Sequence, residues 1–96
     1  MPTYMVERVL PGTTMASVEA LRQAALEACR AITAKGRPVR YLRSIFTPGD
    51  SRCRCLFEAP DAELVRAVNE AAEIPFSRIA LAVELRANPA TDPSGE

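Results

Sequence analysis

Histidine and tryptophan are absent from the 96-residue sequence, and aromatic residues make up only 5% of it. Without histidine, the chain lacks the commonest physiological proton acceptor and metal ligand. Its 12 basic and 12 acidic side chains leave no net charge, which argues against binding nucleic acid through bulk positive charge. No apolar run approaches the roughly 20 residues that cross a bilayer. We therefore expect neither a nucleic acid nor a membrane as partner.

Cysteine is scarce as well, with Cys29, Cys53 and Cys55 as the only three. An odd number of thiols in a chain that is 48% hydrophobic does not suggest a disulfide framework. The N-terminal residues MPTYMVERVL also lack the basic and apolar regions of a secretory leader. We therefore expect a protein of the reducing cytoplasm.

Hydrophobic periodicity predicts six elements. Strands are expected over residues 3–9, 38–47, 51–59 and 78–86, where β-branched and apolar residues dominate or alternate with polar ones. A first helix is expected from an N-cap at Ser17 or Thr14 to the Lys35-Gly36 stop, and a second from an Asp61 cap to Pro75.

The order strand-helix-strand-strand-helix-strand is the ferredoxin-like α+β pattern, a four-stranded antiparallel sheet with both helices on one face. Right-handed crossovers place the first and third strands at its centre. We expect one domain over residues 1–87. Residues 88–96 are small, polar and proline-rich, which predicts a disordered tail.

A two-residue loop at Pro48-Gly49 would set Thr47 opposite Asp50 and decide which side chains are buried. The helix-covered face would then carry Leu42, Phe46, Cys53, Cys55 and Phe57, together with Tyr4, Val6, Ile79, Leu81, Val83 and Leu85. The alternative, a three-residue loop, would place Arg52, Arg54 and Glu58 beneath the helices at a cost of several kcal/mol per unpaired ion.

The pair Cys53 and Cys55 raises the question of a metal or redox site. Their Cα atoms should lie about 6.5–7 Å apart on a strand, at the limit of disulfide geometry. A tetrahedral metal site would need further ligands, and Cys29 is the only other thiol. Because free cysteine is among the most buried residue types, the core interpretation outweighs the functional one.

The open face of the sheet is the candidate site. Glu58, Glu7 and Tyr41 are the candidate catalytic residues, with a carboxylate as base and the phenol as an orienting group or proton donor. Arg43, Arg52, Arg54 and Glu84 are the candidate ligand-binding residues, because guanidinium groups hold anions through charge-assisted bonds. An apolar patch of Met5, Val9, Ile45 and Leu56 on the same face predicts an isologous dimer. The alternative, without a binding or catalytic role, is a solvated face of mutually paired charges.

Three segments carry a resemblance to a known family: YMVERVLPG (4–12), RYLRSIFTPGD (40–50) and CRCLFEAPD (53–61). With them, residues 3–86 resemble a small ferredoxin-like family of unknown function whose described member is an actinobacterial nickel-binding protein. The resemblance implies the same fold and a dimer. It also implies histidines near Arg43 and Val68, which this chain lacks. We therefore expect no bound metal and no other cofactor, because a guanidinium repels a metal ion where an imidazole would bind it.

Two functions remain open from the sequence. The first is a dimeric module that binds a small organic or anionic ligand on the open face. The second is a cofactor-independent enzyme of the dimeric α+β barrel type, an isomerase, cyclase or monooxygenase, for which fold analogy is the only warrant. A domain without any small-molecule site is a third reading.

Overall fold

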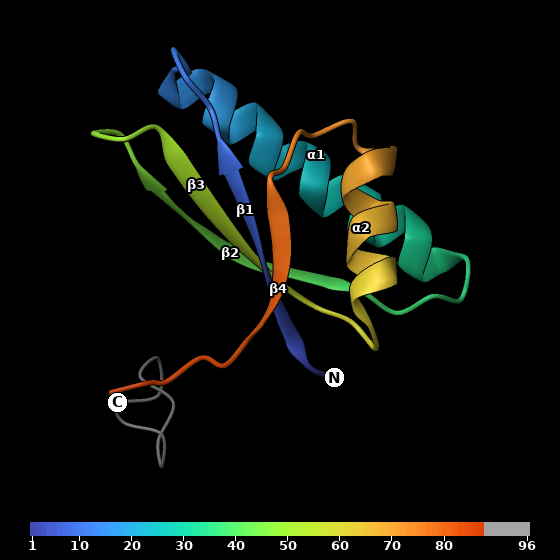
Figure 1. Ribbon diagram of the computed structural model, residues 1–96. Coiled ribbons are helices and arrows are strands. Elements are labelled where there is room, and N and C mark those ends of the chain that lie inside the picture. Colours follow the sequence, from blue (N-terminus) through green and yellow to red (C-terminus); the bar gives the residue numbers. More distant parts are fainter. Residues whose placement is uncertain (88–96) are drawn as a thin grey trace.

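A computed structural model describes residues 1–87 and shows the ferredoxin-like α+β fold (Figure 1). The elements follow in the order β1 (Thr3–Val9), α1 (Met15–Ala34), β2 (Arg40–Thr47), β3 (Arg52–Glu58), α2 (Ala62–Ala71) and β4 (Arg78–Ala82). The predicted element order is confirmed, and the predicted tail at 88–96 lies outside the described residues. No helix within residues 1–87 is long and apolar enough to span a membrane.

The four strands form one antiparallel sheet in the order β2-β3-β1-β4, with β3 and β1 at its centre as predicted. Both helices lie on the same side of this sheet (Figure 1). The core between the two layers is formed by apolar side chains of β1, β3 and both helices, among them Val6, Cys29, Phe57, Leu64 and Val68. In the described part of the chain, no helix therefore covers the opposite face of the sheet.

Side-chain caps determine where the two helices begin. Thr14 is the N-cap of α1, and its hydroxyl accepts a hydrogen bond from the Ser17 amide at 3.1 Å. Asp61 is the N-cap of α2 as predicted, and its carboxylate accepts from the Leu64 amide at 2.9 Å. These bonds satisfy amides that the first turn of a helix leaves without partners.

The hairpin between β2 and β3 has a longer loop than predicted. Thr47 lies opposite Arg52, not opposite Asp50, so the loop comprises residues 48–51. Asp50 favours the longer turn because its carboxylate accepts hydrogen bonds from the Arg52 amide and the Thr47 hydroxyl. Ser51 completes the turn in the left-handed region, at φ 56°.

This error of register does not exchange the faces of the hairpin. The shift amounts to two residues, and side chains alternate with a period of two. Cys53, Cys55 and Phe57 therefore face the helices as expected, and each is fully buried. The expectation that the two cysteines belong to the core is confirmed.

A bulge near the start of β2 does move one predicted site residue to the other face. Tyr41 lies opposite Phe57 and Arg43 opposite Leu56, so Leu42 has no partner on β3. One extra residue reverses the alternation before it. Tyr41 therefore faces the helices, with its ring edge-on to Phe57 at a centroid distance of 5.5 Å, and its predicted place on the open face is wrong.

Strand β4 is shorter than predicted because its neighbour ends first. β1 begins at Thr3, opposite Ala82, so the ladder between β1 and β4 ends there. Ile79 packs on the core as expected. Leu81, near the end of the strand, is 68% exposed, and Val83 and Leu85 lie beyond the strand, 79% and 89% exposed. The predicted contact of these three residues with the helices is wrong.

The cap of α2 gives a test of this fold. Asp61→Ala removes the acceptor of the Leu64 amide, and we expect a loss of about 1 kcal/mol in the free energy of unfolding. Asp61→Asn retains an acceptor and should remain close to wild type. Urea unfolding at a fixed protein concentration measures both variants. Equal stability of wild type and Asp61→Ala would show that the cap contributes nothing.

Candidate functional site

The open face of the sheet brings together six of the seven predicted site residues. They are Glu7 from β1, Arg43 from β2, Arg52, Arg54 and Glu58 from β3, and Glu84 from the segment after β4. Tyr41, the seventh, lies on the other face.

Glu7 is the centre of this charged face. Its carboxylate contacts Arg78 Nε at 3.0 Å, Arg54 Nε at 3.2 Å and an Arg52 terminal nitrogen at 3.5 Å. The register causes this convergence, because Glu7 lies opposite Arg54 on β3 and opposite Arg78 on β4. The Glu7 side chain is only 12% exposed.

The surrounding arginines make Glu7 a weaker base than an ordinary glutamate. The hydrogen bond from Arg78, followed by the charges of Arg54 and Arg52, lowers the pKa of Glu7 against the opposing effect of desolvation. Glu7 is a candidate base from the sequence, and a lowered pKa argues against that role. Arg78 was missed, although extending the alternation of Ala80 and Ala82 back along β4 would have placed it on this face.

Two further ion pairs lie on the β2 side of the open face. Arg40 contacts Glu58 at 3.1 Å, and these residues face each other across β2 and β3. Arg43 pairs with Glu84. Since β2 and β4 are opposite edges of the sheet, the Arg43–Glu84 pair shows that the chain after β4 reaches across to β2.

Among residues 1–87, positive charge exceeds negative charge in the ion pairs of this face. Five arginines, at positions 40, 43, 52, 54 and 78, share three glutamates. Asp50, in the adjacent loop, lies 3.7 Å from Arg52. Among the charges lie the apolar side chains of Val9 and Ile45, which are 48% and 57% exposed.

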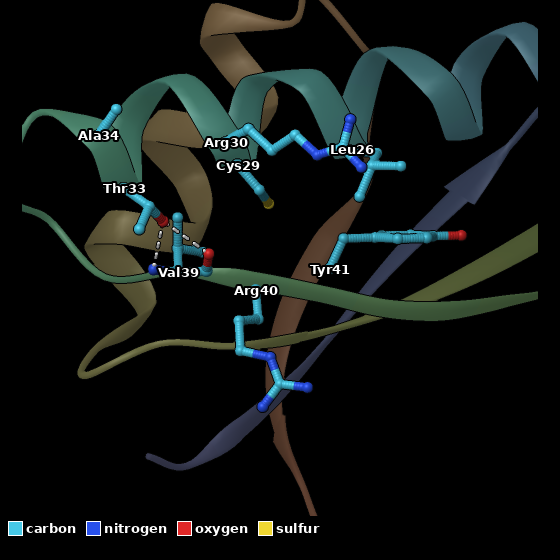
Figure 2. A pocket seen from close by; sticks show the side chains of 8 residues that line it. All are labelled: Leu26, Cys29, Arg30, Thr33, Ala34, Val39, Arg40 and Tyr41. Carbon is cyan, nitrogen blue, oxygen red and sulfur yellow. Dashed lines mark hydrogen bonds between the residues drawn. The ribbon is translucent and has the colours of Figure 1, made fainter.

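Tyr41 belongs to a different feature, a cavity between α1 and the edge strand β2 (Figure 2). Its volume is about 450 Å³, and its lining is mostly apolar, with Leu26, Cys29 and Val39 beside Tyr41. Figure 2 shows Arg40 pointing away from it, to the far side of β2. A second hollow of about 330 Å³ lies along the same groove and includes Tyr41, Ser44 and Phe46.

The Tyr41 hydroxyl is engaged in a hydrogen bond. It lies 2.6 Å from the Ser44 hydroxyl. Burial raises the pKa of Tyr41, and the bond to Ser44 opposes this only in part. The phenol therefore remains protonated at neutral pH and can donate its hydrogen.

The structure also reveals a charged residue in the core that the sequence argument did not identify. Arg8 is fully buried on the helix side, where its guanidinium donates to Asn69 Oδ1 at 2.9 Å and to the Pro75 carbonyl at 3.2 Å. Its position on β1, two residues beyond the buried Val6, was the available signal. An arginine is rarely buried without an anion.

The chemistry of the donors does not suit a metal ion. Within residues 1–87, no three histidine, cysteine or acidic side chains are grouped so that they could hold one. The carboxylate at the centre of the open face is surrounded by guanidinium groups. Cys29 is buried, and burial raises the pKa of its thiol to about 11, which disfavours the thiolate that metals require.

The lowered pKa of Glu7 predicts a contribution to acid stability. A carboxylate with a lowered pKa stabilises the fold fully above its ordinary value of 4.5, and loses this effect as the pH falls through the folded value. We expect Glu7→Gln to lose less stability than wild type below pH 4.5, as measured by urea unfolding across pH. Glu27→Gln, an exposed change on α1, should lose stability with falling pH as steeply as wild type does. An equally steep loss of stability in Glu7→Gln would contradict the role of the three arginines.

Comparisons with known proteins agree with this fold. The crystal structure of SCO4226 from Streptomyces coelicolor A3(2) superimposes with a TM-score of 0.69 at 26% sequence identity, covering 88% of this chain and 99% of that one. A search of curated proteins found no match. The profile of a family described as nickel responsive protein SCO4226-like matches residues 4–81. The chain therefore belongs to the SCO4226-like family of nickel-responsive proteins.

Proposed function

We propose that this protein is a cytoplasmic homodimer that binds a small organic anion between the open sheet faces of its two subunits. The observation that carries the proposal is the excess of guanidinium groups around Glu7. A guanidinium has five N–H donors, whereas one carboxylate offers about four acceptor positions. Arg52, Arg54 and Arg78 therefore have donors left for an anionic ligand.

Exposed apolar side chains support burial of this face against a second copy. Val9 and Ile45 lie among the charges of this face, opposite Arg52 and Arg54 of β3. Exposed apolar groups gathered on one face mark interaction surfaces. An isologous dimer would bury them while each arginine-rich surface faces its own copy. The repulsion between two such surfaces favours an anion in the interface.

Nickel fits this site poorly, although the family is named for its response to nickel. The sequence has no histidine, and Arg43 stands where the resemblance implies one. The nearby carboxylates are already paired with arginine. A divalent cation would have to displace these arginines and remain close to their charges.

The enzyme alternative has less support from the geometry. Its candidate base Glu7 has a lowered pKa, Tyr41 lies on the other face of the sheet, and Glu58 is paired with Arg40. A binding role needs none of these groups to transfer a proton. The three thiols are all free, which suits the reducing compartment that the proposal assumes.

The dimer can be tested by placing a charge in its apolar patch. We expect wild type to have twice the chain mass in light scattering, and Ile45→Glu to be largely monomeric, because a carboxylate cannot be desolvated there without a partner. Met15→Glu changes an equally exposed side chain on α1 and should leave the dimer intact. A wild-type monomer, or an intact Ile45→Glu dimer, would contradict the proposed interface.

Ligand class can be tested by calorimetric titration with citrate and, separately, with nickel chloride. We expect saturable binding of citrate and none of nickel. Arg54→Gln should weaken citrate binding about tenfold or more, because a hydrogen bond to a charged group contributes about 1.5–3 kcal/mol. Arg37→Gln, outside the open face, should bind as wild type does. Saturable nickel binding, or equal citrate affinity in both variants, would count against the proposal.

A further inference from the structure

Within residues 1–87, the buried guanidinium of Arg8 has no carboxylate partner. The guanidinium donates to the Asn69 amide oxygen and the Pro75 carbonyl, which are both neutral, and its Nε has no partner among the described residues. Removing an uncompensated cation from water costs several kcal/mol. Some nearby group must therefore supply negative charge.

The groups on the same face beside Arg8 are the thiols of β3. Arg8 lies directly opposite Cys53 in the ladder, and Val6, on the same face, lies opposite Cys55. Both thiols are fully buried, and their sulfur atoms are 3.8 Å apart. The other elements that meet in this core contribute Asn69, which is neutral, and Cys29, whose thiol remains protonated at neutral pH.

Hydrogen bonds converge on the sulfur of Cys55. The Ser44 hydroxyl donates to Cys55 Sγ at 2.9 Å. Because Ser44 has only one hydrogen to donate, the Tyr41 hydroxyl must be the donor in the 2.6 Å contact between the two side chains. Tyr41, Ser44 and Cys55 thus form a chain of donors that ends at sulfur, and the Cys53 thiol can add a second donor from the other side.

We propose that Cys55 is a buried thiolate that serves as the counter-ion of Arg8 and is the site at which hydrogen peroxide oxidises this protein. The arrangement supplies what a thiolate requires: hydroxyl and thiol donors aimed at sulfur and a cation close by. The pKa of Cys55 is correspondingly lowered to about 6, by the hydrogen bond from Cys53 first and then by Arg8 and Ser44, against desolvation. The pKa of Cys53 is raised, because its hydrogen is shared with Cys55.

Peroxide can approach from the groove between α1 and β2. The hollow of about 330 Å³ in this groove is lined by Ser44, Tyr41 and Phe46. Ser44 therefore contacts both the hollow and the sulfur of Cys55. A molecule as small as hydrogen peroxide needs only a local movement of Ser44 or Tyr41 to reach the thiolate.

The oxidation balances without any other reactant. The thiolate sulfur attacks one peroxide oxygen, the O–O bond breaks, and the departing hydroxide takes a proton from solvent to become water. Sulfur is oxidised to a sulfenic acid, and peroxide is reduced. The strand holds the Cα atoms of Cys53 and Cys55 about 6.5–7 Å apart, at the limit for a disulfide. The oxidised form should therefore persist as the sulfenic acid until an external thiol reduces it.

The first test measures the thiolate directly, by its ultraviolet absorbance near 240 nm as the pH is raised. We expect one thiolate to form at a pH well below the ordinary cysteine pKa of about 8.5. This signal should disappear in Cys55→Ser, remain in Cys29→Ser, and move to higher pH in Ser44→Ala. Denaturant should abolish the difference between Cys55 and the other thiols. A wild-type protein without thiolate absorbance below pH 8 would overturn the proposal.

A second test locates the oxidation. Folded protein at neutral pH is treated with hydrogen peroxide, the excess is removed with catalase, and the protein is then unfolded in dimedone, which traps sulfenic acids, before peptides are identified by mass spectrometry. We expect the adduct on Cys55 alone, at least tenfold above Cys29, and reversal by dithiothreitol when dimedone is omitted. Labelling of Cys29 to the same extent, or no adduct on Cys55, would overturn the assignment even if the thiolate is present. Citrate binding and dimer mass are independent readouts, so failure here leaves the proposed function unaffected.

Discussion

The alternation of side chains along β3 is the constraint on which the rest of the structure depends. Cys53, Cys55 and Phe57 point into the core, and Arg52, Arg54 and Glu58 point away from it. Because β3 pairs with both β2 and β1, this single pattern sets what its neighbours present on each face. It places a thiol pair beside the buried Arg8, and it places two guanidinium groups beside Glu7. The two proposed sites therefore lie on opposite faces of one strand.

Much of this arrangement follows from sequence pattern, and the exceptions have identifiable causes. The strand order and the Asp61 cap could be predicted from local sequence signals. The two-residue error in the hairpin register by itself leaves every side chain on its predicted face, because side chains alternate between the faces with a period of two. Tyr41 was misplaced because periodicity contains no sign of the bulge at Leu42. The end of β4 depends on Thr3, the distant residue at which its partner strand β1 begins. The burial of Arg8 was not predicted, because a pattern of apolar residues does not indicate a cation in the core.

The fold of this family does not require histidine. The chain keeps the architecture of SCO4226 at 26% identity, and it has no imidazole. On the open face it has guanidinium groups, which attract anions and offer no lone pair to a metal. Core packing on the other side of the sheet holds the backbone together, so the fold itself does not dictate which ligand the open face could bind.

The central position of β1 has a consequence for how the chain is made. β1 pairs only with β3 and β4, and its Glu7 bonds to Arg78, 71 positions away. During synthesis β1 leaves the ribosome before the other strands of this sheet, and its partners are residues 52–58 and then 78–82. The hairpin of β2 and β3 can form locally, whereas β1 pairs on both sides only after β4 has been made. Pairing over such long separations slows folding, so the earliest strand of the sheet is the last to be enclosed on both sides.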